Sequence, residues 1–370
     1  MKPTAKLGRL AWRIGLCVVL LGWVFHAIFL AEGHRAWEAA GRDWDMLPRA
    51  EQWRLGWTHG PRELWDTLRL LQPVAGLVSV VFMGLTIALG VVRWRMVLAV
   101  QGIKLSPGRA GEISLVAHFF NSFLLGSTGG DLMKAYYAAR ETQHLKAEAV
   151  VTVIGDRLIG LLAMLLFAAV MLVPNYQLVA ANHRLWALAV VVLAMLAAGL
   201  VVMGLSFRGG LSRRWPQARG WLRRLPKAEA LERALDACRR FGQDQGFIGR
   251  TFAVSMVLNV ACVLQYWTLA RGLNLAIPLP VLFAIVPIII CISALPITPS
   301  GLGVRENLYV WILAVPGIGV PATKALSLSL LAYAGSLLWS IVGGVVYVLF
   351  KGRHHLKEIA AADPPAEDAA

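Results

Sequence analysis

The chain has 370 residues, of which 58% are hydrophobic and only 15% are charged, and its mean hydropathy is +0.62. Soluble domains carry about 25% charged residues, so the composition excludes an ordinary soluble protein and indicates a membrane protein. The net charge of +15 raises the alternative of nucleic-acid binding. The basic residues, however, gather beside hydrophobic runs, as they do in cytoplasmic loops, so we expect lipids and no nucleic acid as partners.

The first hydrophobic run covers residues 14–31 and follows a basic N-terminus. A helix needs about 20 apolar residues to cross the hydrocarbon core, and no clean small-x-small cleavage site precedes "FLAEGH". We therefore expect an uncleaved signal-anchor helix. Residues 32–73 then hold six arginines, no lysine, seven acidic residues and five tryptophans, which predicts an extracytoplasmic loop with short helices at the level of the lipid headgroups.

The remaining runs without formal charge predict further helices, because no alternating strand pattern of about ten residues occurs. They cover residues 74–92, 113–130, 158–181, 185–207, 251–270, 272–304, 307–323 and 325–350. Residues 208–250 hold eleven Lys or Arg against four acidic residues, which predicts a cytoplasmic loop. We expect one transmembrane domain over residues 1–350, a disordered cytoplasmic tail over residues 351–370, and both termini on the inner side of the cytoplasmic membrane.

Counting membrane crossings between the basic loops predicts two hairpins that enter the membrane without crossing it. Two crossings lead from residues 141–149 to the basic loop, so residues 141–149 lie inside. The run at 113–130 also starts inside, and so it has to turn back within "GSTGGD". The same count predicts a second hairpin, inserted from the outer side, that turns within residues 295–306.

The two predicted turns resemble one another in sequence. Residues 127–137 read "STGGDLMKAYY" and residues 299–309 read "PSGLGVRENLY". Each has small residues, then an aliphatic residue, a cation and an aromatic residue. Broken segments inserted from opposite sides are typical of inverted-repeat transporters, whose substrate site lies near mid-membrane. The predicted fold is therefore an all-α polytopic bundle with two oppositely inserted re-entrant hairpins related as an inverted repeat.

Each predicted turn is followed by the start of a helix, where unpaired N–H groups attract anions such as phosphate. Glycines let a backbone approach a ligand closely. Lys134 and Arg305 add positive charge, and Asp131 is placed to pair with Lys134 on one helix face. The alternative is that the glycines serve packing, Asp131 caps a helix and the cations reach the membrane interface. A lipid headgroup site is favoured because ionisable residues inside a membrane mark function.

Asp156 and Arg157 begin the long apolar stretch "GDRLIGLLAMLL". Neighbouring residues do not face each other on a helix, so these two side chains are expected to pair with different partners. Arginine suits the recognition of phosphate or carboxylate. An interfacial location without a binding role remains equally open.

Four stretches, taken together, resemble the lysylphosphatidylglycerol synthase transmembrane-region family of flippase-like membrane domains, over roughly residues 10 to 350. They are "RWRMVLAVQG" (93–102), "NSFLLGSTGGDLMKAYYAAR" (121–140), "GDRLIGL" (155–161) and "LPITPSGLGVREN" (295–307). The resemblance implies movement of a polar- or phosphate-headed lipid between leaflets, without the synthesis of lysyl-phosphatidylglycerol. The candidate headgroup-binding residues are Asn121, Ser127, Thr128, Gly129, Gly130, Asp131, Lys134, Asp156, Arg157, Thr298, Ser300, Gly301, Gly303, Arg305 and Glu306.

Two other functions stay open at this point. The first is a membrane glycosyl- or phosphotransferase, or its accessory factor, acting on polyprenyl-phosphate lipids. We expect no enzyme, because no catalytic constellation, metal-ligand cluster or cofactor motif is evident. The second is an assembly factor that docks through the basic loop at 208–250. The sequence leaves the lipid, the direction, the energy source and the oligomeric state open, a homodimer included.

Overall fold

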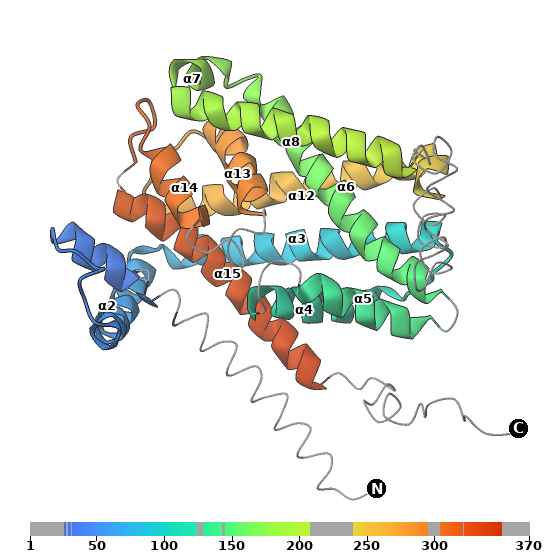
Figure 1. The fold of residues 1–370 in the computed structure, drawn as a ribbon, viewed down its shortest axis with the longest axis horizontal. Helices are drawn as coiled ribbons and strands as arrows, with labels where there is room; N and C mark the ends of the chain where they lie inside the picture. Colours follow the sequence, from blue (N-terminus) through green and yellow to red (C-terminus); the bar gives the residue numbers. More distant parts are fainter. Residues whose placement is uncertain are drawn as a thin grey trace, which may run out of the picture.

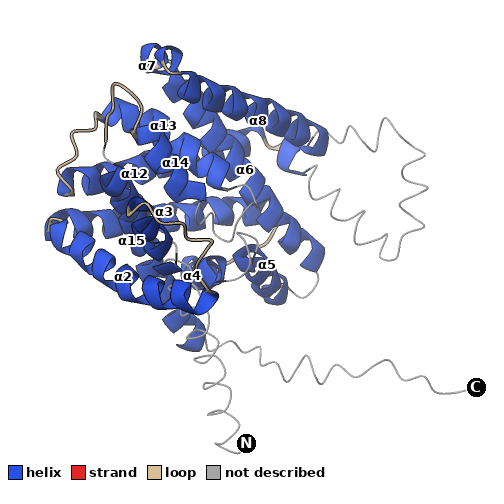
Figure 2. Cartoon of the chain, turned by 60° about the vertical axis from the view of Figure 1, so that its left-hand side comes forward, coloured by secondary structure: helices blue, strands red, loops and turns tan. Residues whose placement is uncertain are grey.

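The computed structural model describes residues 26, 29–30, 32–123, 129–142, 145–207, 240–294, 304–320 and 322–349. These residues form α-helices joined by turns and loops, and no strand occurs among them (Figures 1 and 2). The prediction of an all-α fold is confirmed. The predicted signal-anchor run, most of the basic loop at 208–250 and the tail at 351–370 lie outside the described residues.

Five helices in the described part of the chain are long and apolar enough to cross a membrane. They are α3 (Pro73–Val100), α6 (Lys146–Leu172), α8 (His183–Phe207), α12 (Gln245–Gly272) and α15 (Ala322–Leu349). Each has 25 to 28 residues, and a helix rises about 1.5 Å per residue. They therefore have the length of a multi-pass membrane protein's spanning elements.

The shorter helices form two packed pairs. Helix α4 (Pro107–Phe123) packs against α5 (Gly129–Glu141), and α13 (Leu279–Ser293) packs against α14 (Val304–Leu313). In Figure 1 the first pair lies in the lower right of the molecule and the second pair in the upper left. The two segments predicted as hairpins are thus two pairs of short helices. The sides from which they enter a membrane stay a prediction.

Helices α3 and α12 form the centre of the bundle and run antiparallel along each other (Figure 1). Near one end, the Gln72 backbone N–H donates to the Gly272 carbonyl oxygen at 3.2 Å. Deeper in, a guanidinium nitrogen of Arg93 lies 3.2 Å from the Ser255 hydroxyl. Helix α6 packs on α5 and α13, and helix α15 packs on α4 and α14. Both helix pairs are therefore anchored on a long helix.

Helix α6 begins at Lys146 and not near Leu158, where the sequence predicted the start of the span. The polar residues of "GDR" were taken as the boundary of the apolar run, but their side chains find partners inside the bundle. Asp156 therefore lies well within the helix and is buried. Asp156 is thus in the interior of the bundle, whereas the neighbouring Arg157 stays exposed.

The predicted span at 307–323 is wrong. Helix α14 ends at Leu313 and has ten residues, which is too short to cross hydrocarbon. The chain then turns through Gly317 and Gly319, which have φ values of +93° and +63°. A positive φ favours glycine and ends a regular helix. In the long run at 272–304, α12 ends at Gly272 and α13 begins at Leu279, and most of the turn predicted within residues 295–306 lies outside the described residues.

The tryptophan-rich segment contains a longer helix than expected. Helix α2 (Arg49–Leu70) has 22 residues and lies at the left-hand end of the bundle in Figure 1. A Cβ atom on Gly33 would lie 2.7 Å from the Cα atom of Gly56, so the helix at 32–39 crosses α2 at close range. Trp53, Trp57 and Trp65 are exposed on α2. The extracytoplasmic location of this segment stays a prediction.

Candidate functional site

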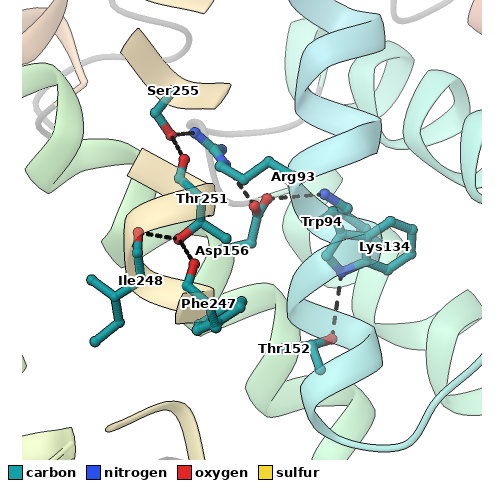
Figure 3. Close-up of polar contacts among 9 residues, drawn as sticks. All are labelled: Arg93, Trp94, Lys134, Thr152, Asp156, Phe247, Ile248, Thr251 and Ser255. Carbon is teal, nitrogen blue, oxygen red and sulfur yellow. Dashed lines mark hydrogen bonds and ion pairs between the residues drawn. The ribbon is translucent and has the colours of Figure 1, made fainter. Parts of the chain in front are cut away.

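Asp156 on α6 holds three helices together through its carboxylate. Arg93 from α3 donates from Nε to Oδ1 at 2.8 Å, and Lys134 from α5 donates from Nζ to Oδ2 at 3.2 Å (Figure 3). The side chains of Arg93 and Asp156 are 13% and 9% exposed. A carboxylate removed from water at this depth is costly unless cations and hydrogen bonds compensate it. The two cations supply this compensation.

Both cations are held in place by further contacts. The ammonium group of Lys134 lies 4.3 Å from the centre of the Trp94 ring, in a cation–π arrangement. The indole N–H of Trp94 points to the hydroxyl of Thr152 at 3.4 Å. Arg93 extends across to Ser255 on α12, whose hydroxyl donates to the Thr251 carbonyl oxygen at 2.8 Å (Figure 3). The cluster therefore connects α3, α5, α6 and α12.

Arg157 follows Asp156 on α6 but pairs with a different residue, Asp131 on α5. The expectation of different partners for Asp156 and Arg157 is confirmed. The expected pairing of Asp131 with Lys134 on one face of α5 is wrong, because Lys134 instead reaches the buried carboxylate of Asp156. The side chains of Arg157 and Asp131 are 41% and 30% exposed. Their ion pair is therefore more accessible than the one around Asp156.

The two ion-pair groups line a cavity of about 350 Å³ in the described part of the bundle. Helices α3, α4, α5, α6, α8, α12 and α13 all contribute to its wall. Its polar side chains are Arg93, Asn121, Asp131, Asp156, Arg157 and Asn259. Leu161, Met164 and Ile290 give it an apolar part. A cavity with ionic and apolar walls fits an amphiphile with a charged headgroup.

Helix α4 packs against the start of α5, so the N–H groups there are not all free to bind a ligand. The Gly130 N–H donates to the Asn121 Oδ1 atom at 2.9 Å. A Cβ atom on Gly130 would collide with the Ala117 carbonyl oxygen. Gly130 therefore allows α4 to approach, which corrects the prediction that a ligand approaches there. Gly129 is buried beside it, and Ser127 and Thr128 lie outside the described residues.

Arg305 and Glu306 form a separate cluster on α14 and do not line this cavity. The Arg305 Nε atom lies 3.1 Å from Glu306 Oε1 and 3.2 Å from the Ser329 hydroxyl of α15. The guanidinium also stacks 4.5 Å from the centre of the Tyr333 ring. Thr298, Ser300, Gly301 and Gly303 lie outside the described residues. The predicted residues are therefore divided between two places.

Several residues of the site were missed by the sequence reasoning. Arg93, Trp94, Ser255 and Asn259 were not among the candidate residues. The motif "RWRMVLAVQG" contained the signal for Arg93 and Trp94, since a charged residue and a tryptophan stand together at the end of an apolar run. Among the described residues, no group of three or more His, Cys, Asp or Glu side chains is arranged to hold a metal ion.

Comparison with known families gives one match. The family model described as the lysylphosphatidylglycerol synthase TM region matches residues 52–344. The matched region contains all the helices from α3 to α14, and it includes both ion-pair clusters. No curated protein matches the chain.

Proposed function

The chain belongs to the lysylphosphatidylglycerol synthase TM region family, and from this premise we propose that it moves a lipid with an anionic or phosphate-containing headgroup between the leaflets of the cytoplasmic membrane. The observation that carries this proposal is the cavity of about 350 Å³ inside the bundle. Its charged wall suits a headgroup, and its apolar wall suits the adjoining part of the lipid. In this proposal the protein changes the location of the lipid and not its chemistry.

The balance of charge around the cavity favours an anion. Arg93 and Arg157 in the wall supply two positive charges, and Asp131 and Asp156 supply two negative charges. Lys134 does not line the cavity, but it pairs with Asp156 from behind the wall, and it leaves the two ion-pair groups together with one positive charge. Arg157 is the more accessible cation, and its planar guanidinium is suited to bind two phosphate oxygens at once. A phosphodiester carries one negative charge and would neutralise the site.

The arrangement of helices supports the two inverted halves predicted from the sequence. In this interpretation α3, α4, α5 and α6 correspond to α12, α13, α14 and α15. Their lengths are 28, 17, 13 and 27 residues against 28, 15, 10 and 28 residues. Their contacts also correspond: α5 packs on α6 and α14 on α15, while α4 packs on α15 and α13 on α6. Transporters built in this way alternate access by moving one half against the other.

The proposed orientation has both termini and the basic loop at 208–250 in the cytoplasm, as the positive-inside rule predicts. Residues 32–73 are then on the outer side. The partners in this proposal are membrane lipids alone, with no nucleic acid and no catalytic step. The oligomeric state does not enter the mechanism.

Transport of a labelled lipid by the purified protein tests the proposal. The full chain is reconstituted in vesicles of phosphatidylethanolamine and phosphatidylglycerol, with a fluorescent label on an acyl chain of phosphatidylglycerol. Wild-type protein should speed the exchange of the label between leaflets. Arg157→Gln should slow it by about tenfold, since a hydrogen bond to a charged group contributes about 1.5–3 kcal/mol.

A matched control is Arg250→Gln at the start of α12, because this arginine is 68% exposed and pairs with Asp244 away from the cavity. It should behave as wild type. If vesicles with the wild-type protein exchanged the label no faster than protein-free vesicles, the result would contradict the proposal. Chemical change of the lipid, detected by mass spectrometry, would instead favour the transferase function.

A further inference from the structure

Glu306 is a buried carboxylate that the proposed site does not use. It is 3% exposed and is part of α14, beside α13 and α15. Arg305 donates to its Oε1 atom from Nε at 3.1 Å and from Nη2 at 2.5 Å, and the Ser329 hydroxyl lies 3.4 Å from the same oxygen. Ionisable groups at such positions in membrane proteins commonly take part in proton or ion pathways.

The groups that face this pair are mostly neutral. Tyr309 of α14 stacks on Tyr266 of α12 with ring centres 5.2 Å apart, and both tyrosines lie within the electrostatic reach of Arg305. Tyr333 of α15 stacks on the guanidinium itself. Cys262 of α12 lies near Tyr266. Helix α13 has Cys291 as its one ionisable side chain in the sequence, and that residue lines the cavity.

The Arg305–Glu306 pair is arranged so that it can open. The two residues are neighbours, and neighbouring side chains leave a helix in different directions. The helix geometry therefore does not hold them together, in contrast to Asp156, which is held by cations from two other helices. Arg305 also has alternative partners, the Ser329 hydroxyl at 3.2 Å and the Tyr333 ring at 4.5 Å. The guanidinium therefore has contacts besides the one with Glu306.

The correspondence between the halves indicates when the pair would open. Lys134 on α5 contacts α6 through Asp156, and Arg305 on α14 contacts α15 through Ser329. The first cluster lines the cavity and the second does not. If the halves exchange places during transport, the second cluster faces the lipid in the other state, and the headgroup phosphate then competes with Glu306 for Arg305.

A carboxylate left without its cation in this apolar surrounding is strongly unfavourable and is relieved by protonation. We propose that Glu306 binds a proton when Arg305 turns to the lipid phosphate, so that a proton and a lipid cross the membrane together. The proton comes from water on the side where the lipid binds Arg305 and converts the carboxylate to a carboxylic acid. It returns to water on the other side when the lipid has passed to Arg157 and Arg305 pairs with Glu306 again; no bond of the lipid is broken. This inference rests on the proposed function and adds its energy source.

A pH gradient across the reconstituted vesicles tests the inference, with the same fluorescent phosphatidylglycerol as the probe. Its phosphodiester stays ionised at the pH values used, and protein-free vesicles control for passive movement. In wild type, the label should accumulate in the leaflet facing the more alkaline compartment. For one proton per lipid the ratio between leaflets changes up to about tenfold per pH unit, the factor by which one pH unit changes proton activity.

Glu306→Gln keeps the shape of the side chain and removes the group that binds the proton. The label should still exchange between the leaflets, but its distribution should not respond to the pH gradient. Glu306→Asp keeps a carboxyl group and should keep the response. Glu112→Gln is the matched control, since this glutamate is 49% exposed at the start of α4 and should respond as wild type.

Wild-type protein that exchanges the label with no response to the gradient overturns the inference and leaves the proposed function standing. An unchanged response in Glu306→Gln also overturns it. No exchange of the label by wild-type protein contradicts the proposed function itself, and both proposals then fall.

Discussion

At the scale of single residues, the carboxylate of Asp156 has a structural and an electrostatic role at once. It is buried in the middle of α6, and it accepts hydrogen bonds from Arg93 and Lys134 of two other helices. Removal of one cation leaves an ion pair, whereas removal of the carboxylate leaves two buried cations. Breaking a buried ion pair so that a charge stays unpaired costs about 3–5 kcal/mol. The two kinds of variant should therefore differ in stability.

Lys134→Met should keep most of the wild-type stability, because Arg93 still pairs with Asp156 at 2.8 Å, while lipid exchange slows. Asp156→Asn should lower the free energy of unfolding by about 3–5 kcal/mol. The double variant should recover part of this loss, since it removes one of the two unpaired cations. Thermal unfolding in detergent, followed by size-exclusion chromatography, measures the stabilities, and the vesicle assay measures exchange. Equal stability of the two single variants would show that solvent reaches the cluster freely.

At the scale of the elements, the sequence predicted the existence of helices better than their ends. Helices α3, α8, α12 and α15 agree with the predicted runs within a few residues at most ends. The start of α6 was missed because charged residues such as Asp156 and Arg157 end an apolar run in the sequence, while in the bundle they are compensated by partners on other helices. Those partners are distant in the chain, so no local pattern contains them.

The turn between α4 and α5 was predicted from the count of membrane crossings, but the role of its glycines was interpreted differently. The structure shows α4 pressed against the start of α5, where the Asn121 side chain accepts the Gly130 N–H. Arg109 and Glu141 join the other ends of the two helices at 2.7 Å. Gly130 also has no positive φ. Close packing, and not backbone conformation, requires glycine here.

Gly130→Ala should therefore destabilise the hairpin, because the added methyl group meets the Ala117 carbonyl oxygen and the Asn121 side chain. Overpacking of this kind costs about 1–3 kcal/mol. The control is Gly111→Ala on α4, where nothing lies within 4 Å of the new Cβ atom. That change should be neutral or should stabilise the helix by up to about 1 kcal/mol. The melting temperatures of the two variants in detergent measure these effects. Equal melting temperatures would show that Gly130 is not tightly packed against α4.

At the scale of the whole molecule, the sequence suggested two related halves but could not predict that the proposed halves surround the cavity unequally. The motifs around Lys134 and Arg305 resemble each other, yet only the first cluster lines the cavity among the described residues. Which cluster faces the cavity depends on how α6 and α15 cross the central helices, and this is a property of the packed bundle. In a transporter that alternates access, one of two equivalent clusters would line the cavity in each state and the other would not.

The contact between α4 and α15 is one of the places where the proposed halves meet, besides those of α3 with α12 and of α6 with α13. The His118 Nε2 atom lies 3.2 Å from the Ser336 carbonyl oxygen, and the Ser122 and Ser340 hydroxyl oxygens are 2.6 Å apart. A Cβ atom on Gly343 would collide with the Leu115 carbonyl oxygen. The two helices therefore touch over several turns, and any motion of one half against the other has to shear this contact.

A disulfide across this contact tests the motion. In the Ser122→Cys/Ser340→Cys variant the two thiols replace hydroxyls that are in contact, so oxidation should join α4 to α15 with little change of structure. If transport requires the halves to move, the oxidised protein should lose lipid exchange by tenfold or more (about 1.4 kcal/mol or more in barrier height), and reduction should restore it. Each single cysteine variant should be insensitive to oxidant, which controls for the native cysteines Cys17, Cys238, Cys262 and Cys291. Mass spectrometry measures the extent of cross-linking. Full cross-linking with undiminished exchange would show that lipid crosses while α4 and α15 stay together, and it would contradict the proposed motion at this contact.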